Sequence, residues 1–158
     1  MGRGFTASEE QLKPDPIHGD KVLARFINCI MRDGKKTRAQ RVVYDALEKI
    51  ETRTKGEPPA IDVFRKAIDN VKPNVEVRSK RVGGANYQVP MQVNRKRQQS
   101  LAFRWIIQSC RKQSGRPMSD RLARELWDAF NGEGQAMSTR DQTHRMADAN
   151  KAFAHFAW

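Results

Sequence analysis

The residue types that most often carry catalysis are few in this chain, and they are poorly spaced. His18, His144 and His155 are isolated from one another, and none has the i, i+4 partner and third ligand that a catalytic metal needs. The adjacent carboxylates Glu9 and Glu10 lie in a segment without apolar periodicity, so nothing fixes the two geometries that acid and base catalysis require. We therefore predict no enzyme, no bound metal and no cofactor.

The two cysteines and the two adjacent glycines also favour structural roles. Cys29 and Cys110 each fall inside an apolar helical pattern and lack C-x-x-C spacing, which predicts two buried free thiols. Gly83 and Gly84 lie between two strand-like stretches and are not followed by the lysine of a phosphate-binding loop. They predict a tight turn, because glycine adopts positive φ at little cost.

Positive charge is the main chemical signal of the sequence. The chain carries +12, and the window from Val71 to Met118 alone carries +10, because the lone acid Glu76 faces eleven bases: Lys72, Arg78, Lys80, Arg81, Arg95, Lys96, Arg97, Arg104, Arg111, Lys112 and Arg116. A surface made basic only for solubility usually mixes both signs, and this window does not. Concentrated positive charge without internal acids therefore predicts a polyanionic partner, and nucleic acid is the obvious one.

The elements that must position these charges are mostly helices. Residues 1–19 mix glycine, proline and charge, which is typical of an extended arm, whereas residues 20–158 predict one helical domain. We expect six helices, which cover approximately residues 20–31, 37–50 with Thr37 as cap, 58–68, 94–110, 119–130 with Ser119 as cap, and 135–158. The fold class is thus mostly α, with a protruding basic β-hairpin between the third and fourth helices.

Alternating apolar residues predict that hairpin at about residues 72–90. Val71, Val75 and Val77 alternate with polar residues, and the return stretch is expected to end at Pro90. Tyr87 has two interpretations that the sequence leaves open, namely stacking on a nucleobase or packing within the hairpin. No apolar run of 18 residues and no secretory signal occur, so we expect a soluble intracellular protein without membrane contact.

Four segments resemble the bacterial-type small-subunit ribosomal protein seven family. They are KPDPIHGD with the following ARFINCIMRDGKK, the hairpin PNVEVRSKRVGGANYQVP, the stretch SLAFRWII, and THRMADANKAFAH, and they occur in the family's order over most of the chain. The resemblance implies a primary binder of small-subunit ribosomal RNA, in its 3′ major domain, that nucleates assembly of the subunit head. It also implies a place near the exit-site transfer RNA and the messenger path, beside small-subunit ribosomal proteins nine and eleven, without homo-oligomerisation. A cytoplasmic ribosome is expected, with a bacterial or organellar source left open.

Charge and resemblance together nominate the residues of the RNA surface. The RNA-binding candidates are Arg3, Lys13, Lys35, Lys36, Arg78, Lys80, Arg81, Arg95, Lys96, Arg97, Arg104, Arg111, Lys112, Arg116, Met118, Arg140, His144 and Arg145. The hairpin tip expected at the exit site consists of Val82, Gly83, Gly84, Ala85, Asn86 and Tyr87. Most of these contacts would go to phosphates, which fix register more than they read bases.

The chain departs from the family at both ends. Its N-terminal arm contains Glu9 and Glu10 where relatives carry several bases, and Ser138, Thr139 and Ala157 stand where relatives tend to carry lysines and an arginine. These differences predict a smaller contribution of the arm to RNA affinity and a weaker C-terminal contact with transfer RNA.

The competing function is a free-standing DNA-binding or architectural regulator. Such a protein would present its base-reading residues on one exposed helix face together with a dimer surface. Here the bases are spread over a hairpin, a helix and loops.

Overall fold

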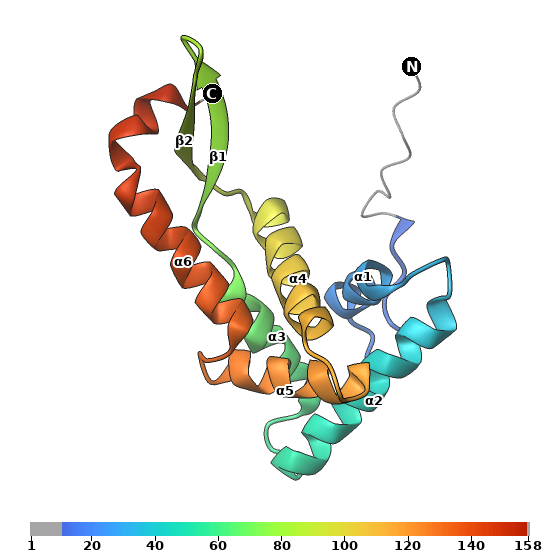
Figure 1. The fold of residues 1–158 in the computed structure, drawn as a ribbon. Coiled ribbons are helices and arrows are strands. Elements are labelled where there is room, and N and C mark those ends of the chain that lie inside the picture. Colours follow the sequence, from blue (N-terminus) through green and yellow to red (C-terminus); the bar gives the residue numbers. More distant parts are fainter. Residues whose placement is uncertain (1–10, 158) are drawn as a thin grey trace.

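A computed structural model of the chain describes residues 11–157. Among these residues it confirms a mostly helical fold with a β-hairpin between the third and fourth α-helices (Figure 1). In chain order the elements are α1 (Lys21–Ile30), α2 (Lys36–Thr54), α3 (Ala60–Val71), β1 (Val75–Val82), β2 (Ala85–Gln92), α4 (Arg95–Lys112), α5 (Met118–Phe130), α6 (Gln135–Ala149) and the 3-10 helix η2 (Lys151–Phe156). None of the described helices is long and apolar enough to span a membrane.

One hydrophobic core joins all six α-helices. Phe26 of α1 lies at its centre, and its ring meets Phe64 of α3 and Phe103 of α4 edge-on, with ring centroids 5.4 and 5.3 Å apart. Leu122 and Leu126 of α5 are fully buried in the same cluster. Edge-to-face aromatic pairs of this kind add specific geometry to the burial of apolar area, so α1, α3 and α4 hold one another in fixed relative positions.

Helix ends differ from prediction where a hydroxyl was expected to act as the cap. Helix α2 begins at Lys36, before Thr37, and α5 begins at Met118 after Pro117, with Ser119 inside its first turn. Neither helix has a side-chain cap, and most of the stability of a helix in a folded protein comes from packing of its apolar face. The predicted left-handed stop does not end α1, because its C-cap Met31 is extended with φ of −60° and ψ of 139°. The left-handed residues Asp33 and Gly34, with φ of 55° and 69°, turn the chain in the loop that follows.

The hairpin is shorter at its start and longer at its end than predicted. Val71 is the last residue of α3 because it continues that helix's buried stripe, so β1 begins at Val75. The strands pair from Val75 with Gln92 to Val82 with Ala85, and the turn is the predicted pair of glycines. Pro90 does not end β2 but pairs with Val77 inside it. A proline is tolerated there because each strand of a two-stranded sheet is an edge strand.

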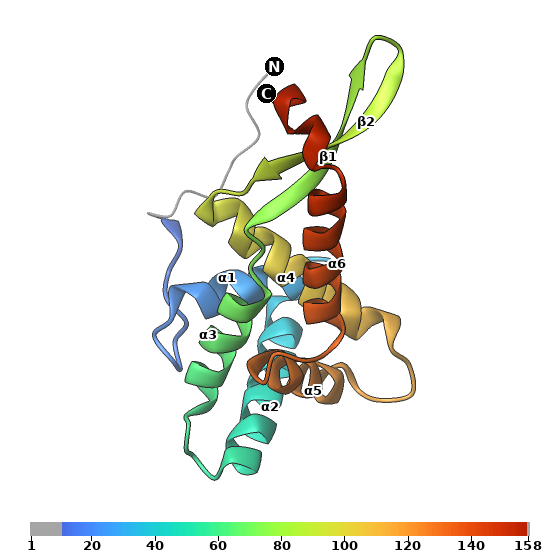
Figure 2. The same ribbon diagram turned by 90° about the vertical axis from the view of Figure 1, so that its left-hand side faces the viewer.

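The last expected helix is divided in two, and its second part braces the hairpin. Helix α6 ends at Ala149 and η2 continues from Lys151, so the chain turns onto β2 (Figure 2). The Tyr87 ring lies 5.1 Å from the centroids of both Phe153 and Phe156. Lys80 adds a hydrogen bond from Nζ to the Phe156 carbonyl oxygen at 2.7 Å. An isolated hairpin is marginal in water, and these contacts supply the support that it needs.

Candidate nucleic-acid interface

Helix α4 carries a row of arginines from the hairpin to the opposite end of the domain. It runs from the base of the hairpin toward α5 (Figure 1), and its 18 residues correspond to a length of about 27 Å. Arg97, Arg104 and Arg111 recur every seven residues, so they lie on one face at intervals of about 10 Å. Asn94 caps the helix, its side chain accepting a hydrogen bond from the backbone N–H of Arg97 at 2.9 Å. The row is therefore fixed in direction by a capped and buried helix.

At the hairpin end of this row, the lone acid of the basic window binds two arginines. Glu76 of β1 is only 9% exposed, and its carboxylate accepts from Arg78 at 2.9 Å and from Arg97 at 3.1 Å. We call Glu76, Arg78 and Arg97 the hairpin root. The sequence predicted that the bases of this window lack internal partners, and for these two arginines the structure shows that the prediction is wrong. Glu76 partly neutralises their charge, and its ion pair with Arg97 joins β1 to α4.

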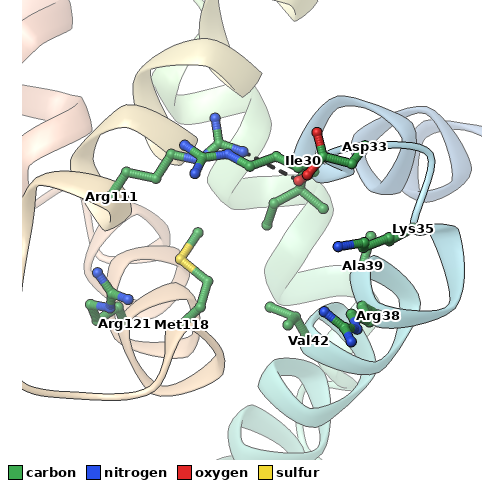
Figure 3. Close-up of a pocket in the computed structure, with 10 residues that line it drawn as sticks. Ile30, Asp33, Lys35, Arg38, Ala39, Val42, Arg111, Met118 and Arg121 are labelled. Atoms are coloured by element: carbon green, nitrogen blue, oxygen red, sulfur yellow. Dashed lines mark hydrogen bonds between the residues drawn. The ribbon is translucent and has the colours of Figure 1, made fainter.

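At the other end of α4, a pocket of about 450 Å³ opens between α1, α2, α4 and α5 (Figure 3). Its cationic lining, which we call the basic pocket, consists of Arg32, Lys35, Arg38, Arg111 and Arg121, and the only acid among its described lining residues is Asp33. Arg111 donates from Nη2 to the Ile30 carbonyl oxygen at 3.2 Å, which draws the guanidinium across the pocket. Partial desolvation and the neighbouring charge of Arg32 lower the pKa of Arg111 below its ordinary value.

The basic pocket has properties that suit phosphate. Like charges held close together repel one another and are relieved by a bound anion. The pocket floor is apolar, formed by Ile30, Ala39, Val42 and Met118, which suits the less polar parts of a nucleotide. The Nη1 of Arg121 donates to the carbonyl oxygens of Cys110 and Gln113, so this side chain also closes the end of α4.

Sequence reasoning named Lys35, Arg111 and Met118 of this pocket and missed three residues. Arg32 and Arg38 lie before the basic window and Arg121 lies just after it, so the charge count of that window did not include them. Arg38 follows Lys35 by three residues, a spacing that puts both on one face of a helix, and that signal could have identified it. Arg32 could not have been found, because its neighbour Arg111 is distant in sequence.

The remaining predicted contacts of α4 and its flanking loop lie at the surface. Arg95, Lys96, Arg104, Lys112 and Arg116 are exposed, and so is Lys36 in the first turn of α2. Lys13 is exposed in the segment before α1, whereas Arg3, Glu9 and Glu10 lie outside the described residues. The exposed bases of α4 thus lie along the same helix as Arg111, whose side chain lines the basic pocket.

Two predicted contacts of α6 are engaged within the protein. Arg140 donates to the Asn70 carbonyl oxygen and pairs with Asp141 at 2.7 Å. His144 accepts a hydrogen bond through Nε2 from the backbone N–H of Asn74 at 3.2 Å. Both side chains hold α6 against the end of α3 and the link to β1. Arg145, one residue later, is exposed.

The hairpin tip is accessible except for Val82 and Tyr87, which are half-buried. Arg81, Ala85 and Asn86 are exposed, as are Gly83 and Gly84. The two glycines have φ of 58° and 86°, the left-handed conformation expected of this turn. Tyr87 packs on η2, which favours the second of its two interpretations, packing within the hairpin region.

The histidines and cysteines have structural surroundings. His18 lies near Tyr44, and His155 packs against Phe156 with ring centroids 4.2 Å apart. Within residues 11–157, no group of three or more His, Cys, Asp or Glu side chains could hold a metal ion. Cys110 is buried as predicted, but Cys29 is exposed, because it lies on the solvent face of α1 beside the buried stripe of Phe26, Ile27 and Ile30.

Comparison with known proteins agrees with this arrangement. Residues 2–151 match the family model described as ribosomal protein S7p/S5e. Relatives named small ribosomal subunit protein uS7 include those of Rhodopirellula baltica, 61% identical over 100% of both chains, and Paracoccus denitrificans, 51% identical over 100% of both. The uS7 of Nautilia profundicola is 55% identical over 96% of this chain and 97% of its own. The chain therefore belongs to the ribosomal protein S7p/S5e family, and with it to the structural rather than enzymatic proteins of the ribosome.

Proposed function

We propose that this protein is a primary binder of small-subunit ribosomal RNA that contacts the 3′ major domain and nucleates assembly of the subunit head. The observation that carries the proposal is the basic pocket together with the exposed bases of α4, the helix that leads to it. Phosphate contacts from such a surface supply affinity and register, while the rigid helical core fixes their spacing. A folded RNA junction with phosphates at matching positions is recognised through its shape.

The hairpin and α6 form a second surface that is available for binding. The tip, with Arg81, Gly83 and Asn86 exposed, projects from the helical domain (Figure 2). We assign it to the neighbourhood of the exit-site transfer RNA and the messenger path, with small-subunit ribosomal proteins nine and eleven as neighbours in a cytoplasmic ribosome. One copy acts per subunit. Ser138 and Ala157 are exposed and uncharged, so the C-terminal contribution to transfer RNA binding is weaker than in relatives with bases there.

The competing DNA-binding function finds less support in the geometry. A reader of the major groove needs an exposed helix face rich in base-reading side chains. The α4 row includes Arg97, which is bound to Glu76, and Arg111, which spans the basic pocket. The row therefore suits phosphates distributed over a folded RNA better than the base edges of a straight duplex.

The test measures binding of the full chain to a transcript of the 3′ major domain across a range of salt concentrations. We expect this RNA to bind about 100-fold more tightly than duplex DNA or a transcript of another domain of equal length. The logarithm of affinity should fall linearly with the logarithm of salt concentration, with a slope of roughly 0.7 to 0.9 per phosphate contact. Equal affinity for duplex DNA would contradict the proposal.

A second measurement places the protein in the cell. Sedimentation of a lysate through a sucrose gradient should show the chain comigrating with small subunits and whole ribosomes. A signal confined to the top of the gradient, or one lost on treatment with DNase, would favour the regulator.

A further inference from the structure

A second concave site lies on another side of α2, away from the residues that line the basic pocket. It is a groove of about 360 Å³ between α2, the segment before α1 and the start of α3. Its walls include Tyr44, Leu47 and Glu48 from α2, Ile17 from the preceding segment and Ile61 from α3. The α2 residues lie three and four positions apart, so they form one stripe along the helix and the groove runs along it.

The charge of this groove is opposite to that of the protein. No lysine or arginine is among its described lining residues, although the chain holds 30 of them, and Glu48 and Glu51 line its rim. Asp15, which is only 2% exposed, accepts a hydrogen bond from the hydroxyl of the lining residue Tyr44. Carboxylates placed here repel phosphate, so the groove is not a continuation of the RNA surface.

An apolar side chain at the edge of the groove is left in water. Ile17 is 64% exposed. It is the more exposed of the two large hydrophobic residues that are exposed among residues 11–157. It is not on a loose loop, because Asp15 Oδ2 accepts from the backbone N–H of Ile17 at 3.1 Å and of His18 at 2.9 Å. A rigidly presented aliphatic side chain beside an apolar groove gains free energy when a partner covers it.

We propose that this groove is a docking site for a cationic peptide segment of another protein. An aliphatic side chain of the segment inserts against Ile17, Leu47 and Ile61, and a neighbouring lysine or arginine pairs with Glu48. The side chain of Glu48 has no hydrogen-bond or ion-pair partner among residues 11–157, so its charge is available. The site shares no lining residue with the basic pocket, and it stands independently of the proposed RNA binding.

The test titrates the isotope-labelled full chain with a short capped peptide that alternates lysine with leucine, and follows the backbone amide signals. Amides around Ile17, Tyr44, Glu48 and Ile61 should shift. Two reference peptides separate the contributions: glutamate in place of lysine should abolish the shifts, and serine in place of leucine should weaken them strongly.

Two variants locate the site. Glu48→Gln should weaken peptide binding roughly threefold, since it removes one exposed charge pair, and Ile17→Ser should weaken it by a similar or larger factor. Both positions are exposed, so neither change should disturb folding. The matched control Glu133→Gln removes an exposed acid between α5 and α6 and should leave peptide binding unchanged. None of the three should alter affinity for the 3′ major domain transcript.

Four outcomes would overturn the docking site. The peptide could shift only amides of other surfaces, the acidic peptide could bind equally well, or the RNA transcript could shift the groove amides. A concentration-dependent dimer that protects the same amides would also overturn it, because the occupant would then be a second copy of this chain. If the chain bound the peptide as expected but did not bind the 3′ major domain transcript, only the proposed function would be contradicted.

Discussion

The basic pocket and the hairpin root contain the same kind of side chain in opposite electrostatic conditions. In the pocket, partial desolvation and the charge of neighbouring Arg32 together lower the pKa of Arg111. In the hairpin root, Glu76 forms ion pairs with Arg78 and Arg97. The first region holds charge available for an external anion, and the second uses charge to join a strand to a helix. Net charge along the sequence therefore overstates how much charge is free for RNA.

The strongest test of this difference removes three charges from the basic pocket. The triple variant Arg32→Gln, Lys35→Gln and Arg38→Gln should lower affinity for the 3′ major domain transcript on the order of 100-fold at moderate salt. The salt slope should fall by roughly 2 to 3, because each lost phosphate contact contributes about 0.7 to 0.9. All three side chains are exposed, so the free energy of unfolding should change little.

A matched triple variant controls for the lost charge alone. Lys21→Gln, Arg41→Gln and Lys55→Gln remove the same charge from exposed positions outside the pocket. If this control lowered affinity and slope as much as the pocket variant, general electrostatic attraction would explain binding and the pocket would have no special role.

The next largest effect is expected at the hairpin root, on stability rather than on RNA. Glu76→Gln leaves two guanidiniums beside a neutral side chain in a nearly buried position, and should lower the free energy of unfolding by about 1 to 3 kcal/mol. Urea unfolding measures this, with Glu133→Gln as the exposed control. If Glu76→Gln instead raised RNA affinity and increased the salt slope, the two arginines would belong to the RNA surface and the contrast between the regions would fail.

A third prediction extends the comparison to another internally paired arginine. Asp20 caps α1 through the backbone N–H groups of Val22 and Leu23 and pairs with Arg65 at 2.5 Å. Burial opposes ionisation of Asp20, but the hydrogen bonds from Leu23 and Arg65 outweigh it and lower its pKa below the ordinary value of 3.8. Its stabilisation is therefore present above the unfolded-state pKa and lost as pH falls through the folded-state pKa.

The variant Asp20→Asn makes this testable, because asparagine still caps a helix but carries no charge. Near neutral pH the variant should unfold at lower urea concentration than the parent protein, and the gap should narrow once pH falls below 3.8. A gap that stayed constant through that range would show that the carboxylate charge does not contribute.

The smallest effect is expected from the brace of the hairpin. Tyr87→Ala removes the ring that contacts Phe153 and Phe156, and should speed amide hydrogen exchange in η2 and β2 while affinity for the transcript is unchanged. Loss of transcript affinity would instead mean that Tyr87 contacts RNA, the other interpretation that the sequence left open.

Much of the fold could be predicted because local pattern and packing agree in it. The apolar stripes of α1 and α3 place Phe26 and Phe64 in the core, and the glycine pair gives the hairpin turn. Val71 fits both a helical and a strand period, and only its burial in the core, as the last residue of α3, decides between them. Pro90 and Thr37 show the same limit, because a local rule was overruled by the surrounding structure.

The site could be predicted only in part, because it depends on pairs distant in sequence. Arg111 meets the Ile30 carbonyl 81 residues away, and no local pattern reports that contact. The partnership of Glu76 with Arg97, 21 residues later, was missed for the same reason. Composition identifies that a chain is basic, whereas tertiary structure decides which of its bases have internal partners.

The brace on the hairpin has a consequence for the order of events during synthesis. Lys80 and Phe156 are 76 residues apart, so the hairpin leaves the translating ribosome long before its support has been made. Contacts between such distant residues form late, after the local helices. The hairpin thus acquires its contacts with η2 only at the end of synthesis, and any nascent chain that stops before η2 lacks the partners of Tyr87 and Lys80.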